Sequence, residues 1–387
     1  MKPDILPSTY LTYYPRKSTR NMIKWILRQY IRMHTPTSVP TSDEELDAAY
    51  LKYTSSKTDS EIAADIITYP QKLFKLGLSP MTVKQRVSII DRYFDDACNF
   101  HISGNQKRLR NLGLRGAHPV SSETTLTSAI IKTLLMHSDI RMRALILVLS
   151  SSGMRIGEAL ALRTTDIDFE STPVKLRLRA ETTKNGMPRT AFITDEAAEA
   201  VGVWLGIRED TLALSRARHT TRMPEESDPA SVFPYSRVTE STRLIRVTKR
   251  AGYYSPDTQT RHNAVHFHSF RKWFLTQFKL AGGNVTVAEC LAGHSGYLDL
   301  SYRRITDDEL AEEYKKVLPR LTIDTPDDYF ECKIKNADEI AKLQINSAQQ
   351  QAIINRLLQE LENVKRNQGR LSLTSGTVLP SSDIDID

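Results

Sequence analysis

One segment without an acidic residue, residues 103–120 (SGNQKRLRNLGLRGAHPV), divides the chain into two parts of different character. Glycine and proline interrupt it, and these residues break helices and strands. Its cations include Lys107, Arg108 and Arg110. We therefore predict a flexible basic linker over residues 103–121, with a separately folded part on each side. A solvated connector and a stretch that lies against phosphates both fit this charge.

The part before the linker has the pattern of amphipathic helices. Apolar residues recur at helical spacing between Met22 and Ile31, and again over Ser79–Phe100. This periodicity predicts a helical domain over residues 18–102. Residues 1–17 are rich in proline and tyrosine and are expected to form a flexible leader.

The part after the linker combines helices with a short sheet. Thr127 is placed to cap a helix that has a buried stripe, and the run ALILVL at residues 144–149 is typical of a buried helix. Apolar and basic residues alternate over Val174–Ala180, and Asn185-Gly186 predicts a tight hairpin before a returning strand. We predict a mainly α-helical fold with a small β-sheet, whose second domain covers residues 122–320.

The carboxyl-terminal region differs from both parts. Apolar residues between 335 and 366 follow a heptad that Ser347 and Gln350 interrupt, so an amphipathic helix and a small coiled coil remain equally good interpretations. Residues 367–387 are rich in serine, threonine and aspartate and are expected to be a disordered tail.

Composition and charge favour some classes of protein over others, although they do not identify one. Lys and Arg number 53 against 46 acids, which gives a net charge of +7 and fits a polyanionic partner. The three cysteines have no zinc or disulfide spacing, and no apolar run approaches the ~20 residues of a membrane span. A signal peptide is not recognisable. We therefore expect a cytoplasmic protein that neither spans nor binds a membrane.

Three short segments hold the polar residues that fit chemistry best. SSGMRIGEALALRTTDIDF contains Arg155 and Glu158, HFHSFRKWFLTQF contains His268 and Arg271, and CLAGHSGYLDLSYRRI contains His294 and Tyr302. Lys184 lies between the first two, beside the expected hairpin turn. Taken singly, each has an ordinary structural explanation, such as a buried ion pair or a solvated lysine. The ordered set is what indicates a site.

This set matches the needs of phosphodiester cleavage. Two arginines bind the non-bridging oxygens, whose negative charge grows during attack, and arginine keeps its proton. A tyrosine phenol can form a covalent intermediate, a histidine can assist as base or hydrogen-bond partner, and a lysine can protonate the leaving oxygen. No step requires a metal or another cofactor. We therefore expect neither.

The ordered set resembles that of the tyrosine recombinases, which include the phage and archaeal integrases. The resemblance covers residues 122–320 as a catalytic domain and residues 18–102 as a core-binding domain. It implies that Arg155 and Arg271 bind the scissile phosphate, that Glu158 orients Arg155, and that Lys184 is the general acid. It further implies supporting roles for His268 and His294, with Tyr302 as the nucleophile. Double-stranded DNA would be the partner, bound by a homotetramer in the nucleoid.

The sequence departs from the family pattern at the tyrosine. The nucleophile usually lies nine residues after the second histidine, a position that Arg303 occupies here. Tyr302 is one residue short of it, and Tyr297 and Tyr314 are alternatives. A capping box at Thr306 begins a helix on which Tyr314 joins an apolar stripe, which favours packing for Tyr314.

Four cations in one further helix, Arg243, Arg246, Lys249 and Arg250, are candidate DNA contacts, together with Lys107, Arg108 and Arg110. A solvated surface is the alternative. A relaxase like the type IB topoisomerases and a catalytically silent DNA-binding protein of the same fold remain alternatives for the whole chain. A metal-dependent nuclease is a third.

Overall fold

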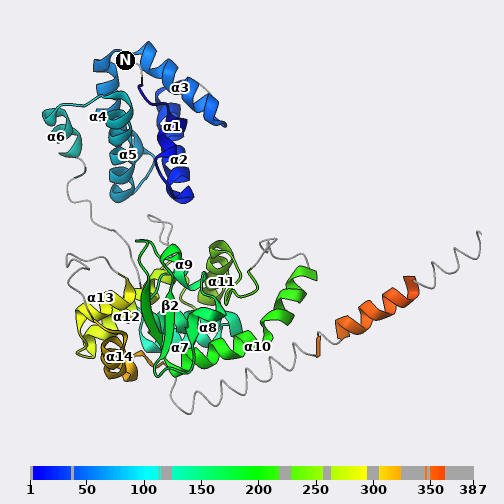
Figure 1. Ribbon diagram of the computed structural model, residues 1–387. Coiled ribbons are helices and arrows are strands. Elements are labelled where there is room, and N and C mark those ends of the chain that lie inside the picture. Colours follow the sequence, from blue (N-terminus) through cyan, green and yellow to red (C-terminus); the bar gives the residue numbers. More distant parts are fainter. Residues whose placement is uncertain are drawn as a thin grey trace, which may run out of the picture. The chain divides into compact units, whose positions relative to one another are not determined.

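The computed structural model describes residues 3–35, 39–112, 114, 124–217, 228–255, 263–293, 305–323, 345–346 and 349–361. These residues form two compact units, one before and one after the segment around residue 122 (Figure 1). Each unit has its own buried core. The fold is mainly helical with one small sheet, which confirms the predicted fold class.

The first unit is built from helices. They are α1 (Pro7–Thr12), α2 (Lys17–His34), α3 (Asp43–Ser56), α4 (Asp59–Lys75), α5 (Pro80–Cys98) and α6 (Gly104–Leu112). Ser42 and Thr58 begin α3 and α4 with capping boxes, and Ser79 caps α5 just before Pro80. The core is unusually aromatic, because Tyr30, Tyr50 and other tyrosines are fully buried and meet edge to face.

Two segments of this unit correct the sequence analysis. Residues 7–12, expected in a flexible leader, form α1, because Tyr10 is buried in the core and the Ser8 amide donates to Asp47 Oδ1 at 2.9 Å. Residues 104–112, expected in a flexible linker, form α6. Ser103 starts that helix, since its hydroxyl accepts from the Gln106 amide and Gln106 Oε1 accepts from the Ser103 amide. The serine–glutamine pair was the overlooked signal.

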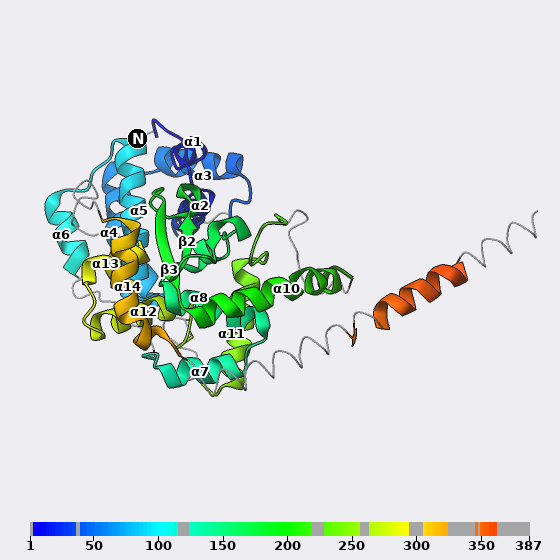
Figure 2. The same ribbon diagram turned by 60° about the horizontal axis from the view of Figure 1, so that its bottom comes forward.

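The second unit has α8 (Ile140–Ser152) at its centre. Every residue of α8 except Arg143 is buried, and the helix contacts α10 (Asp195–Ala217), α12 (Phe267–Leu280) and β3 (Arg189–Ile193). Figure 2 shows α10 running along α8. The remaining helices are α7 (Ser128–Met136), α9 (Ile156–Ala159), α11 (Arg237–Arg250), α13 (Val285–Ala292) and α14 (Asp307–Leu321). The predicted Thr127 cap is confirmed, since its hydroxyl accepts from the Ile130 amide.

The sheet contains three antiparallel strands in the order β1 (Ile167–Asp168), β2 (Val174–Leu178), β3. The register pairs Val174 with Ile193 and Leu178 with Arg189. Alternate residues of β2 are buried, as the sequence pattern predicted. The predicted returning strand is confirmed as β3, and a turn does lie at Lys184-Asn185, where the Gly186 amide donates to the Thr183 carbonyl. The tight two-residue hairpin was wrong, because the connection between the strands spans residues 179–188 and includes a 3-10 helix, Ala180–Thr182. Within this connection the amide and the hydroxyl of Thr182 both donate to the Arg179 carbonyl.

Residues 349–361 are helical, within the region where an amphipathic helix or coiled coil was expected. Ile353, Ile354, Leu357, Leu358 and Leu361 of this helix are about half exposed. The tail over residues 367–387 lies outside the described residues. None of the helices in the described ranges is long and apolar enough to cross a membrane.

Candidate active site

Arg155 is held at the start of α9 by its own helix. Glu158 Oε2 accepts from the Arg155 amide at 2.7 Å, and Oε1 accepts from Arg155 Nη1 at 3.0 Å. Arg155 Nη2 donates to the Gly293 carbonyl at 3.0 Å. The Arg155 side chain keeps 29% of its surface exposed, whereas that of Glu158 keeps only 2%. A buried carboxylate thus orients a guanidinium that still reaches solvent.

Arg271 lies on the inner face of α12. Phe267, Phe270, Phe274 and Phe278 of this helix are all buried, and they fix its orientation against the core. Arg271 is 1% exposed, and its Nη1 donates to the carbonyls of Gly153, at 2.8 Å, and Ala292. No atom of the described residues accepts a hydrogen bond from its Nε or Nη2.

The charges around Arg271 do not cancel. Burial, together with the nearby cations Arg155 and Arg189, lowers the pKa of Arg271 to about 10, so the guanidinium stays charged at neutral pH. Glu158 is the acid that acts on it. Burial raises the pKa of Glu158, but hydrogen bonds and charge from Arg189 and Arg155 outweigh this and hold it below its usual value. Three cations therefore surround one anion.

Arg189 is the member of this cluster that the sequence analysis missed. It stands at the start of β3, 10% of its side chain is exposed, and it forms two hydrogen bonds to Glu158, at 3.1 and 2.7 Å. Its Nε donates to the Leu291 carbonyl at 3.0 Å. The one available signal was its position at the end of the segment ETTKNGMPR, on the strand that follows Lys184.

Lys184 and His268 both lie at the surface of the second unit. Lys184 is exposed in the connection between β2 and β3, and His268 is exposed in the first turn of α12. The His268 ring is nearly parallel to that of His266, with 6.4 Å between centroids. His266 Nδ1 is within 3.1 Å of the Ser269 hydroxyl, so it belongs to the start of the helix. His268 lies three residues before Arg271 on the same helix.

Tyr302, His294 and the alternative Tyr297 lie outside the described residues. Tyr314 is described and fully buried in α14, where its hydroxyl donates to the Ser151 carbonyl at 2.9 Å. Burial raises the pKa of Tyr314 well above its usual value, so its phenol is hard to ionise. The predicted packing role for Tyr314 is confirmed.

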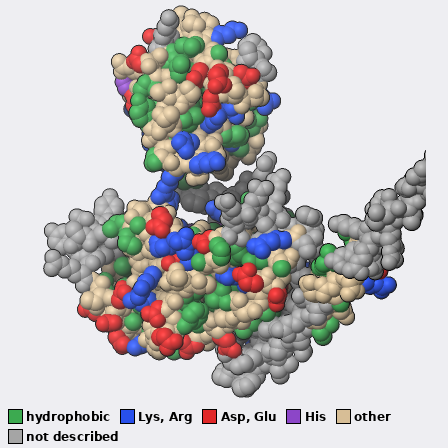
Figure 3. All heavy atoms as spheres, turned by 45° about the vertical axis from the view of Figure 1, so that its right-hand side comes forward, with side chains coloured by type: hydrophobic (Ala, Val, Ile, Leu, Met, Phe, Trp, Pro, Cys, Tyr) green, Lys and Arg blue, Asp and Glu red, His purple; other side chains and the backbone are tan. Residues whose placement is uncertain are grey.

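The candidate DNA contacts divide by exposure. Lys107 and Arg108 are exposed on α6, and Arg246, Lys249 and Arg250 are exposed on α11. Arg110 is 5% exposed and paired with Asp91 at 2.5 Å, and Arg243 is paired with Asp139. In the view of Figure 3, lysine and arginine side chains spread over the middle of the second unit, while acids gather along its lower edge.

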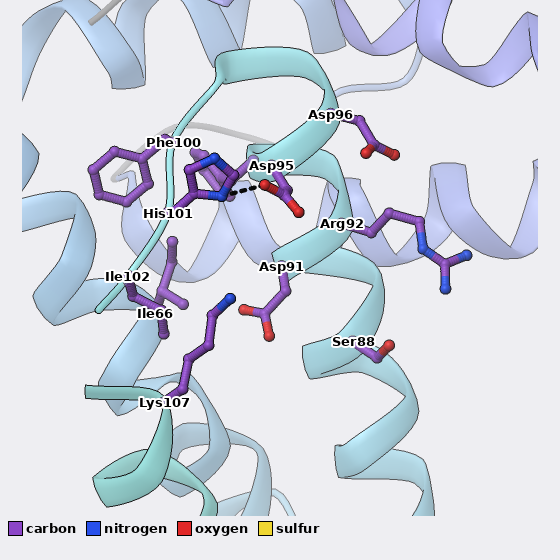
Figure 4. A pocket seen from close by; sticks show the side chains of 11 residues that line it. Ile66, Ser88, Asp91, Arg92, Asp95, Asp96, Phe100, His101, Ile102 and Lys107 are labelled. Carbon is purple, nitrogen blue, oxygen red and sulfur yellow. Dashed lines mark ion pairs between the residues drawn. The ribbon is translucent and has the colours of Figure 1, made fainter. Parts of the chain in front are cut away.

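A cavity of about 470 Å³ in the first unit lies between α4, α5 and α6. Figure 4 shows Lys107 directed toward Asp91, and an ion pair between His101 and Asp95. The cavity is therefore lined by acids and bases together. Across the described ranges there is no group of three or more histidine, cysteine or acidic side chains that could hold a metal.

Comparison with known proteins identifies the second unit. Residues 124–298 match the model of the phage integrase family. A tyrosine recombinase of Thermosipho africanus is 20% identical over 298 residues, covering 74% of this chain and 95% of that protein. Tyrosine recombinase XerC of Chromobacterium violaceum is 26% identical over 186 residues, covering 47% of this chain and 54% of that protein. Residues 124–298 therefore form a phage integrase family domain, and the relatives that the chain matches are tyrosine recombinases.

The recombinase is a DNA strand transferase by family. Among solved structures it is similar to a lambda integrase fragment, solved as a dimer bound to a COC′ core site. That likeness has 16% identity and a TM-score of 0.48, and covers 78% of this chain and 96% of the other. The family match includes the positions of Arg155, Lys184, His268, Arg271 and His294. Tyr302 follows just beyond its end.

Proposed function

We propose that this recombinase cleaves and rejoins duplex DNA through a 3′-phosphotyrosine bond at Tyr302. The Tyr302 phenol attacks the scissile phosphorus and loses its proton, with His268 or His294 as the partner that accepts or shares it. The bond to the 5′-oxygen breaks, and Lys184 donates the proton that this oxygen takes. The 5′-hydroxyl of a second strand then reverses the exchange, so that one phosphodiester replaces another.

The buried guanidinium of Arg271 is the observation that carries this proposal. Its Nε and Nη2 are hydrogen-bond donors without an acceptor among the described residues, and a buried charged donor left unpaired is costly. Arg155 lies close by, and within the described part of the chain Glu158 is the acid that acts on both. A phosphodiester that enters the cluster would supply the missing acceptors and negative charge.

The test is a nicked suicide substrate without divalent metal. The duplex is one that the full chain selects by binding from a random pool, nicked so that the cleaved strand diffuses away. We expect a protein–DNA band that survives denaturation with the wild type and disappears with Tyr302→Phe. A band that requires a divalent metal, or that persists in Tyr302→Phe, overturns the proposal.

Tyr314→Phe is the matched control. It removes the hydroxyl that donates to Ser151, which is expected to cost about 1 kcal/mol of unfolding free energy. We expect its covalent band to equal that of the wild type. Loss of the band in Tyr314→Phe alone would show that the nucleophile is Tyr314 and that its assignment to Tyr302 is wrong. Bound DNA without a band from any variant would favour the catalytically silent alternative.

The proposal also covers the residues that bind duplex DNA and the number of chains that assemble on it. Exposed Lys107 and Arg108 on α6, and Arg246, Lys249 and Arg250 on α11, are suited to phosphate contacts, whereas Arg110 and Arg243 already have acidic partners. Exchange between two duplexes needs four cleavages, so we place four copies of the chain on the DNA. A lambda integrase tetramer bound to a Holliday junction is among the similar structures. An enzyme with this substrate would be found with the nucleoid.

A further inference from the structure

Three arginines converge on the carboxyl end of α13. Arg189 Nε donates to the Leu291 carbonyl, Arg271 Nη1 to the Ala292 carbonyl and Arg155 Nη2 to the Gly293 carbonyl. These carbonyls are consecutive, and the last carbonyls of a helix have no partner within it and carry partial negative charge. The arginines come from β3, α12 and the start of α9. One helix end thus fixes the spacing of three cations.

Arg189 also shares Glu158 with Arg155. Arg189 Nη1 and Nη2 each donate to one Glu158 oxygen, in the paired geometry that arginine and carboxylate prefer. The same two oxygens accept from the side chain and the amide of Arg155. The carboxylate therefore divides its charge between two guanidiniums. Without Arg189, Arg155 would be the one described guanidinium hydrogen-bonded to this carboxylate.

The Arg189 side chain packs closely against Gly293. The Gly293 φ of 74° lies in the left-handed region, and a Cβ built there would be 2.6 Å from Arg189 Cζ. The guanidinium thus packs against the residue that ends α13. In the chain, Gly293 is followed directly by His294 and then by the segment with Tyr302. In the other direction, β3 follows the connection that carries Lys184.

We infer that Arg189 is a positioning residue for DNA cleavage. It takes a share of Glu158, keeps a net positive charge on Arg155 and Arg271, and joins β3 to the end of α13. This inference rests on the proposed function, because it assigns Arg155 and Arg271 to the phosphate. Arg189 itself acts through Glu158 and Arg155 and contacts no reacting atom.

Arg179 offers a matched control on the same hairpin. It follows β2, and like Arg189 it pairs with a carboxylate, Asp166 at 3.2 Å, and donates to a carbonyl, Ala161 at 2.7 Å. No described contact links it to Arg155 or Arg271. An arginine that matters only for folding should therefore behave as Arg179 does.

The experiment compares Arg189→Met with Arg179→Met in the full chain. Single-turnover cleavage of the selected nicked duplex, its Kd and the Tm are measured for each. We expect Arg189→Met to slow cleavage about 10- to 100-fold, the range for lost supporting contacts in catalytic sites, with Kd changed less than about threefold. Arg179→Met should lower the Tm and leave the cleavage rate within about threefold. Equal cleavage rates in the two variants would overturn the inference.

A second substitution tests whether Arg189 acts by sharing the charge of Glu158 or only by stabilising the fold. In Arg189→Met, adding Glu158→Gln removes the carboxylate that now neutralises Arg155, so the double variant should cleave at least about fivefold faster than Arg189→Met. A purely structural arginine predicts a double variant that is as slow or slower. If Arg189→Met does not fold, Arg189→Lys is compared with Arg179→Lys, and equal cleavage rates again overturn the inference. A wild type without a covalent band would instead reject the proposed function.

Discussion

Gly153 sets the spacing between the two arginines proposed for the phosphate. It ends α8 with a φ of 63°, and its carbonyl accepts from Arg271 while Arg155 follows two residues later. A Cβ built on Gly153 would be 2.3 Å from the Phe274 ring. Backbone conformation and close packing both require glycine at this position.

Gly153→Ala tests this requirement against Gly186→Ala. Gly186 also has a positive φ, 71°, but a Cβ there meets nothing within 4 Å. We expect Gly186→Ala to cost about 1 kcal/mol of unfolding free energy, from the left-handed conformation alone. Gly153→Ala should cost about 1–3 kcal/mol more, because Phe274 must move. Denaturant unfolding measures both, and equal costs would show that Phe274 yields without strain.

Local signals predicted the elements where chain-neighbouring residues decide the structure. The buried run in α8, the phenylalanines of α12 and the Thr127 cap all depend on residues within a few turns of one another. Other elements depend on distant partners. Helix α1 is ordered by Asp47 and the core of the first unit, and Asp91 adds a distant partner to the local Ser103 cap of α6, so composition alone indicated flexible segments.

Helix α2 holds a histidine whose protonation opposes folding of the first unit. Burial lowers the pKa of His34 to about 4, against a hydrogen bond with the Tyr30 carbonyl and the nearby Asp65, which raise it. Lys57 and Lys72 are the other charges that act on it, and both lower its pKa. Tyr30, Tyr53 and Tyr69 surround its ring. The folded state therefore favours the neutral imidazole.

The sign of the pH dependence follows from these values. An unfolded histidine has a pKa near 6.5, so between about pH 6.5 and 4 the unfolded chain binds a proton that the folded chain does not. Stability should therefore fall as the pH drops through this window, by about 2 kcal/mol at pH 5. His34→Gln should remove that part of the slope in denaturant unfolding followed by the first unit's tyrosines. An unchanged slope would contradict a neutral buried His34.

At the scale of the whole molecule, the helix over residues 349–361 presents apolar side chains to solvent. Five of them occupy one side, and Glu360 pairs with Arg356 along its edge. So short a helix is marginal in water unless it packs against something. We expect this side to contact the same helix of another copy in the proposed four-chain complex on DNA.

Leu357→Glu and Gln359→Glu test that contact with the same added charge on opposite sides of the helix. Leu357→Glu should weaken the four-chain complex on DNA about 10-fold or more, because it places a charge in an apolar contact, and Gln359→Glu should not. Sedimentation of the protein–DNA complex measures both. A lower Tm for Leu357→Glu with unchanged assembly would show that this side packs within its own chain.

The candidate site was predictable as a set of residue types but not as a network. Arg155, Glu158 and Arg271 stand in recognisable motifs, and the structure brings them together. Arg189 was missed because its role depends on Glu158 and Leu291, which are distant in sequence. Tyr314 could be set aside from the periodicity of its helix alone.

The most direct test identifies the residue that becomes covalently bound to DNA. The covalent complex formed by the wild type on the nicked duplex, in the presence of a metal chelator, is digested with nuclease and protease. Mass spectrometry then locates the remaining nucleotide. We expect it on the phenolic oxygen of Tyr302, joined through a 3′-phosphate. A nucleotide on Tyr314 or Tyr297, or no adduct unless a divalent metal is supplied, would contradict the mechanism.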